Sequence, residues 1–181
     1  MGYTHYWRRP AIIPRACWFQ LRADVERLVK ASPVPLAFEY DDPTHRPELS
    51  SVVIRFNGVR EAGFEAFLLP RLYGLRDGEM PDAAGRRFQF CKTNYKAYDL
   101  LVTSTLISVK HRLGDLVIVE SDGEDEEWQA AREFCLKVLG YGARYHIQGR
   151  ALVDVSRMPD ATHTNGESTQ QSSKEKDRKE S

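Results

Sequence analysis

Polar side chains that could carry out chemistry gather where a predicted strand gives way to a predicted helix: Cys91, Lys92, Thr93, Asn94, Tyr98 and Asp99. A thiol at a helix N-terminus has a lowered pKa, because the partial positive charge there stabilises the thiolate, and Lys92 would add to this effect. Main-chain N–H groups at the same place lack partners and bind phosphate or carboxylate. The stretch therefore favours either a nucleophile or an anion-binding turn.

Cys91 is the predicted nucleophile. His5 would act as its base, and Asp99 or Asp122 would orient the imidazole. The alternative is that Cys91 is a small buried apolar residue, as free cysteines commonly are. No family-specific nucleophile signature surrounds Cys91, so both interpretations stay open.

A ligand site is predicted near the same turn. Tyr3, His5 and Trp7 alternate along one strand and share a face, where they could form an aromatic wall. From the turn, Lys92, Thr93, Asn94 and Tyr98 could complete the site. The alternatives are a hydrogen-bonded histidine inside a sheet and ordinary helix capping by Thr93 or Asn94.

No metal or cofactor is predicted. The acidic run from Glu124 to Glu127, with Asp122 before it, does not have the spacing of a calcium loop, and it suits the positive end of a helix dipole. The three cysteines are widely spaced and lack the pairing typical of zinc sites or of a disulfide framework.

Hydrophobic periodicity predicts three helices: one over 15–31, one from Tyr95 to Arg112, and one that begins after Ser121-Asp122-Gly123 and buries Trp128. Alternating or apolar runs predict strands at 3–9, 36–40, 51–56, 65–72, 88–91 and 116–119, with a last strand at 145–147 or 151–155. The order is strand, helix, four strands, helix, strand, helix. It predicts an α+β fold, with a mostly antiparallel sheet and the three helices packed largely on one face.

Length and composition predict one α+β domain over 1–156. After Ser156 the sequence becomes polar and lacks large apolar residues other than Met158, so 157–181 is predicted to be a disordered tail. A net charge of zero argues against nucleic acid as a partner, and no apolar run is long enough to span a membrane. Unpaired cysteines and the lack of a signal peptide indicate a soluble, cytoplasmic protein. The oligomeric state is left open.

Several motifs together resemble a family of small uncharacterised proteins from bacterial, phage and fungal genomes. They are the opening GYTHYW, the FCKT turn with Tyr98-Asp99 behind it, and the SDG turn with Trp128. The resemblance covers roughly Met1 to Gly142. It implies that these stretches act as one unit, and it implies no activity.

The favoured function is a small ligand-binding domain, with a pocket for an anionic or aromatic small molecule near His5 and the 91–94 turn. One alternative is a cysteine-dependent enzyme that uses Cys91 and His5. The other is a protein-interaction or regulatory module without a catalytic site.

Overall fold

The computed structural model describes residues 2–74 and 79–157. Its three helices and antiparallel sheets form an α+β fold, as the sequence predicts. The helices are α1 (Arg15–Ala31), α2 (Asp99–Leu113) and α3 (Gln129–Leu139). The strands are β1 (Thr4–Arg9), β2 (Leu36–Ala37), β3 (Glu48–Leu49), β4 (Val53–Gly58), β5 (Phe67–Pro70), β6 (Arg87–Lys92), β7 (Ile118–Ser121), β8 (Tyr145–Gln148) and β9 (Ala151–Asp154).

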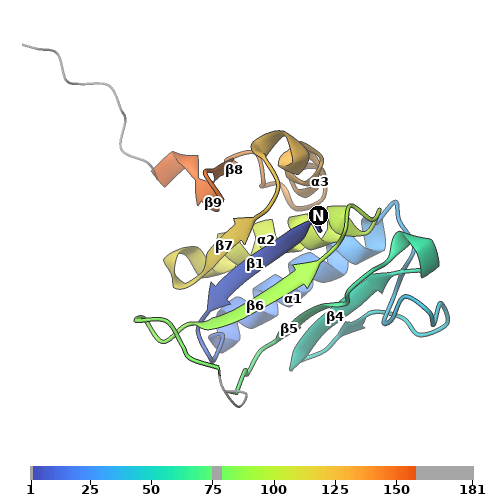
Figure 1. The fold of residues 1–181 in the computed structure, drawn as a ribbon, viewed down its shortest axis with the longest axis horizontal. Helices are drawn as coiled ribbons and strands as arrows, with labels where there is room; N and C mark the ends of the chain where they lie inside the picture. The colour runs from blue at the N-terminus through green and yellow to red at the C-terminus, as the bar shows by residue number, and fades with distance from the viewer. Residues whose placement is uncertain (1, 75–78, 158–181) are drawn as a thin grey trace, which may run out of the picture.

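The strands form two sheets where the sequence predicted one. Five strands pair in the order β6-β1-β7-β9-β8, and β4 pairs with β2, β3 and β5 in the second sheet. Every pairing is antiparallel. Figure 1 shows the two sheets next to each other, with β6 of the first facing β5 of the second.

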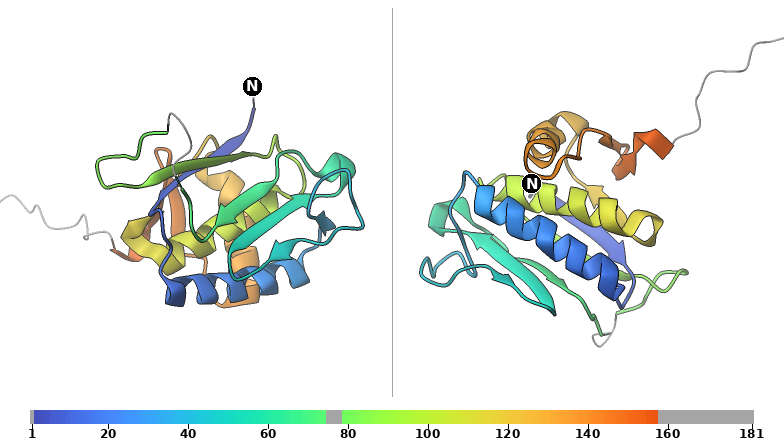
Figure 2. Two further views of the ribbon diagram at one scale, coloured as in Figure 1. Left: turned by 90° about the horizontal axis from the view of Figure 1, so that it is seen from below. Right: turned by 180° about the vertical axis from the view of Figure 1, so that it is seen from behind.

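The helices pack on one side of the sheets. Figure 2 shows α1 and α2 next to each other across this side, and α3 packs against both. Helix α2 lies in the middle and is therefore buried almost all round. Its small polar residues Thr103, Ser104 and Ser108 are buried as well as the apolar residues of the predicted face. Thr103 and Ser108 each donate to the carbonyl four residues earlier, which satisfies their hydroxyl groups.

Several predicted boundaries are corrected by local backbone geometry. Helix α2 begins at Asp99 and not at Tyr95, because Asn94 and Tyr95 have φ values of +51° and +59°, which a right-handed helix cannot contain. Both candidates for the last strand exist, as β8 and β9, and they pair with each other. Of the predicted tail, only Arg157 lies within the described residues.

The buried side chain of Arg9 joins the two sheets. Its side chain is fully buried and donates to Gln89 Oε1 of β6 and to the Pro70 carbonyl of β5, at 3.0 and 2.5 Å. Burial lowers the pKa of the guanidinium to about 10. Neutral acceptors surround the cation, so it holds the sheets together by hydrogen bonds, with no carboxylate beside it among the described residues.

Candidate ligand-binding groove

An open groove of about 510 Å³ lies beside the turn that joins β6 to α2. One wall is this turn, which contributes Asn94 and Lys96. The other wall comes from the segment after β2 and the loop after β4, which contribute Tyr40, Arg60 and Phe64. Tyr40 and Phe64 are 50% and 38% exposed, so both rings offer surface to a ligand.

The loop after β4 is fixed by the side chain of Asn57. This buried amide donates to the Phe64 carbonyl and accepts the Phe64 N–H, at 3.0 and 3.1 Å. The two ends of the loop meet at Gly58 and Gly63, where a Cβ atom on either residue would lie within 2.2 Å of a main-chain oxygen of the loop. Only glycine permits this close approach. The main chain of Phe64, from which the ring extends, is therefore held in place.

The opposite wall is fixed by Tyr98. Its hydroxyl donates to the Glu65 carbonyl at 2.5 Å, and its N–H donates to the Ala62 carbonyl at 3.3 Å. Burial raises the pKa of this phenol, so it stays a hydrogen-bond donor. Tyr98 was predicted to contact a ligand directly, but it is fully buried and instead holds the two walls together.

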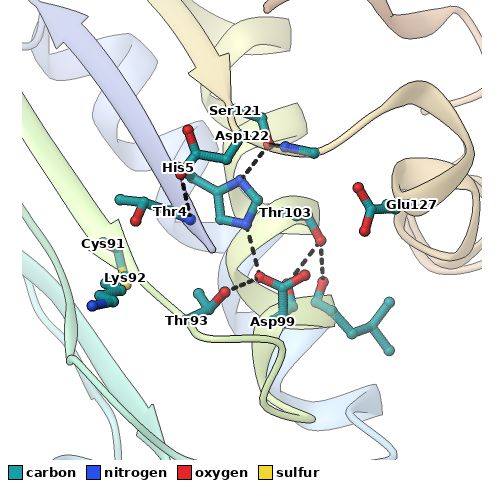
Figure 3. A network of polar contacts seen from close by, with 12 residues as sticks. Thr4, His5, Cys91, Lys92, Thr93, Asp99, Thr103, Ser121, Asp122 and Glu127 are labelled. Atoms are coloured by element: carbon teal, nitrogen blue, oxygen red, sulfur yellow. Dashed lines mark hydrogen bonds and ion pairs between the residues drawn. The ribbon is translucent and has the colours of Figure 1, made fainter. Parts of the chain in front are cut away.

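The inner side of the turn is anchored by a buried network around His5 (Figure 3). His5 Nε2 lies 2.7 Å from Asp99 Oδ1, and Thr93 Oγ1 donates to the same oxygen at 2.6 Å. His5 Nδ1 lies 3.0 Å from Ser121 Oγ. The network joins β1, β7 and the first residue of α2.

The Asp99 carboxylate can only accept, so His5 Nε2 is the donor in the contact between them. Ser121 Oγ accepts the Gly123 N–H at 2.9 Å and the Trp128 Nε1–H at 3.3 Å, and it also lies next to His5 Nδ1. The order serine, histidine, aspartate is that of a hydrolytic triad. However, Ser121 is 1% exposed, so its hydroxyl does not reach the surface in this conformation.

Asp122, the other predicted orienter of His5, belongs to a separate set of contacts. Its carboxylate accepts the Thr4 N–H, the Tyr6 hydroxyl and a guanidinium N–H of Arg150. It therefore fixes the SDG turn against β1. Of the two aspartates proposed from sequence, the structure brings Asp99 to His5.

The predicted low pKa of Cys91 is wrong. Its thiol is fully buried, and this burial raises the pKa of the group. Cys91 lies in β6, and α2 begins only after the turn, at Asp99. Cys91 is paired with His5 across β1 and β6, yet its sulfur contacts Tyr98 and the Glu65 carbonyl, whereas the His5 ring contacts Ser121 and Asp99. Cys91 is thus a buried core residue.

The predicted aromatic wall is also part of the core. Tyr3, His5 and Trp7 share a sheet face as predicted, but they are 2%, 0% and 1% exposed. They offer no surface to a ligand in this conformation. Of the residues predicted from the turn, Asn94 lines the groove, Thr93 binds Asp99, and the Lys92 ammonium lies 5.6 Å from the centre of the Phe64 ring.

Of the eight described residues that line the groove, seven were not predicted from the sequence: Tyr40, Asp41, Arg60, Glu61, Gly63, Phe64 and Lys96. Exposed aromatics in loops have no periodicity that would distinguish them. The Asn57-Gly58 pair followed by Gly63 is the available signal, since closely spaced glycines mark a loop that folds back on itself.

The fold and the groove define a small α+β protein with an open mixed-charge depression. A scan of protein-family models, a search of curated proteins and a search of solved structures each gave no significant match to the chain. The resemblance inferred from the motifs therefore stays a prediction, although the structure brings His5, Thr93, Asp99, Ser121 and Trp128 into one network.

None of the helices in 2–74 and 79–157 is both long and apolar enough to cross a membrane. Within the same ranges, no three His, Cys, Asp or Glu side chains are grouped as metal ligands.

Proposed function

We propose that the protein binds a small aromatic molecule with an anionic group in the groove between the loop after β4 and the turn before α2. The observation that supports this most directly is the combination of two exposed rings with two cations. Tyr40 and Phe64 lie with Arg60 and Lys96 around one volume of about 510 Å³. Neither Arg60 nor Lys96 forms an ion pair with any residue in the described part of the chain.

The ligand chemistry follows from the lining. A planar ring gains contact area against Tyr40 and Phe64, and aromatic pairs contribute about 0.5–1.5 kcal/mol beyond the buried area. A phosphate or carboxylate on the ring would bind Lys96 or Arg60 by charge-assisted hydrogen bonds. Asp41 and Glu61 also line the groove, so hydroxyl or amino substituents on the ligand would have acceptors.

The His5 network has a positioning role in this proposal. It binds the inner side of the turn through Thr93 and Asp99, while Asn94 and Lys96 face the groove on the outer side. Because Asn94 and Tyr95 adopt left-handed backbone conformations, the turn needs such an anchor to keep its shape.

The test uses adenosine monophosphate as an anionic aromatic probe and adenosine as the matched neutral probe. In ¹H–¹⁵N NMR spectra, we expect the monophosphate to shift the amides of Phe64, Asn94 and Lys96, with a Kd near ~1 mM or tighter, which corresponds to about −4 kcal/mol. Adenosine should bind more weakly, because it lacks the group that binds the cations.

Two substitutions separate the contributions of ring and charge. Phe64→Ala should weaken the binding of both probes, whereas Lys96→Gln should weaken the binding of the monophosphate alone. Lys137→Gln changes an exposed lysine on α3 and serves as the control. Two results would contradict the proposal. One is that the groove amides show no change in chemical shift, and the other is that Lys96→Gln binds the monophosphate with unchanged affinity.

The cysteine-dependent enzyme and the interaction module were the alternatives predicted from sequence. The raised pKa of Cys91 and its lack of contact with His5 give the enzyme no support. The interaction module stays a prediction.

A further inference from the structure

A second hollow, of about 430 Å³, adjoins the groove and is lined by Tyr40, Gly63, Phe64 and Glu65. The first three of these residues also line the groove, so the two spaces share the same pair of aromatic rings. Of the two spaces, Arg60 and Lys96 line only the groove, whereas Glu65 lines only the hollow. A ligand that spans both spaces therefore meets cations in one and this carboxylate in the other.

Glu65 is tied to the strand and helix behind it. Its N–H donates to the Lys92 carbonyl at 3.3 Å, and its carbonyl accepts the Tyr98 hydroxyl at 2.5 Å. Glu65 Oε2 accepts the Lys92 N–H at 2.9 Å. Glu65 is nevertheless exposed, and Oε1 has no hydrogen-bond or ion-pair partner within residues 2–74 and 79–157. The main chain and one carboxylate oxygen are thus held, and the other oxygen is left to accept from a ligand.

We propose that the ligand is a guanine nucleotide, with its base in the hollow and its phosphate at Arg60 and Lys96. This inference rests on the proposed small-molecule function and names the class of ligand. Guanine carries the N1–H and the 2-amino group side by side on one edge. A carboxylate can only accept, so the two oxygens of Glu65 match this pair of donors. The planar base would also gain contact with the rings of Tyr40 and Phe64.

The other common bases fit the carboxylate less well. Adenine and cytosine each present a ring-nitrogen lone pair beside the amino group, so one carboxylate oxygen would face another acceptor. Uracil has a single N–H between two carbonyl oxygens. The Lys92 ammonium lies 5.6 Å from the centre of the Phe64 ring. This cation favours the same choice, because O6 of guanine accepts a hydrogen bond where the amino group of adenine donates one.

The same base could also reach the hollow as part of single-stranded RNA. Such a strand needs cations along its successive phosphates. The groove offers Arg60 and Lys96, but Asp41 and Glu61 lie in the same lining. The whole chain has a net charge of zero. The charges therefore favour a free nucleotide with one phosphate-bearing end.

The test is an NMR titration of the full chain with guanosine, inosine and adenosine monophosphates. Guanosine monophosphate should bind roughly 10-fold more tightly than adenosine monophosphate, because one bidentate contact distinguishes them. Inosine monophosphate keeps the N1–H and lacks the 2-amino group, so its affinity should fall between the two. The Lys92 amide should shift more with guanosine than with adenosine monophosphate, because it donates to the carboxylate that would bind guanine.

Two matched variants make the result specific. Glu65→Gln replaces one acceptor oxygen with a donor, so the affinity for guanosine monophosphate should fall roughly 10-fold. The same variant should keep its affinity for adenosine monophosphate, which would show that the groove is intact. Glu61→Gln is the control, because it removes an equal charge from the groove and leaves the hollow unchanged. It should keep the preference for guanine.

Each contrary result has its own meaning. Equal affinities for guanosine and adenosine monophosphates, both weakened by Lys96→Gln, would overturn the guanine assignment and leave the proposed function standing. A guanine preference that persists in Glu65→Gln would overturn the role of this carboxylate. Groove amides that no monophosphate shifts would end both proposals. Tighter binding of the RNA pentamer UUGUU than of guanosine monophosphate would replace the free nucleotide by an RNA strand.

Discussion

His5 donates from Nε2 to Asp99 Oδ1 across 2.7 Å, and these two residues stand 94 positions apart in the sequence. The bond attaches the N-terminal end of α2 to the second residue of β1. His5 is fully buried and Asp99 has 19% of its side chain exposed, so the bond is largely shielded from water. Such a contact contributes more to the shape of the turn than an exposed ion pair would.

Removal of the Asp99 carboxylate should destabilise the fold. In Asp99→Ala, the His5 Nε2–H and the Thr93 hydroxyl lose their acceptor, and an unsatisfied buried donor costs about 1–3 kcal/mol. Asp99→Asn keeps an acceptor and should cost less. Urea unfolding measures both, with Asp115→Ala as the control, because the side chain of Asp115 is 92% exposed. Equal stability of Asp99→Ala and wild type would mean that the network is not formed in solution.

Thiol labelling should distinguish the three cysteines by burial. Cys91 and Cys135 are fully buried with raised pKa values, whereas Cys17 is partly exposed. Iodoacetamide at neutral pH should therefore modify Cys17 first, and mass spectrometry of tryptic peptides would report the order. This is the reverse of what a reactive Cys91 requires. Selective labelling of Cys91 would restore the cysteine-dependent hypothesis.

Stability should fall with pH in the alkaline range. Burial raises the pKa of Cys135 from about 9 in the unfolded chain to about 12 in the fold. Between these values the unfolded state releases a proton that the folded state keeps, so the free energy of unfolding decreases as pH rises. One such group contributes a slope of up to about 1.4 kcal/mol per pH unit. Cys135→Ala should show a shallower decline above pH ~9 than wild type, measured by urea unfolding. Parallel declines would contradict the assigned burial.

Leu106 tests the central position of α2. The side chain is fully buried within the core, so Leu106→Ala should cost about 2–5 kcal/mol in the free energy of unfolding. Leu136→Ala on α3 is the matched control, because this leucine is 49% exposed. A cost below about 0.5 kcal/mol for Leu106→Ala would place the residue at the surface.

The fold class was predictable because periodicity is local. The helix over 15–31 has the same bounds as α1, since its apolar residues recur at helical spacing and Ser32-Pro33 follows. The division into two sheets was not predictable, because pairing depends on contacts between distant strands. The start of α2 was missed for another reason: left-handed conformations at Asn94 and Tyr95 are rare and have no sequence signature in Tyr95.

The candidate site was predictable in part. His5, Asp99 and Thr93 were singled out for their chemistry, and the structure brings them together. Their role differs from the predicted one because burial cannot be read from residue type: polar groups in a core and in a cleft look alike in sequence. Phe64 and Lys96 were missed because the groove is formed by two loops that meet only in the folded chain.

The place of β1 in its sheet has a consequence for biosynthesis. The strand lies between β6 and β7, and His5 bonds to Ser121, which follows it by 116 residues. At translation rates of about 5–20 residues per second, β1 leaves the ribosome on the order of 10 s before its last partner is made. During that time Tyr3 and Trp7, both core residues of the finished fold, remain without their sheet. We expect the chain to acquire its native sheet late in synthesis and to depend on chaperones that hold aromatic segments until then.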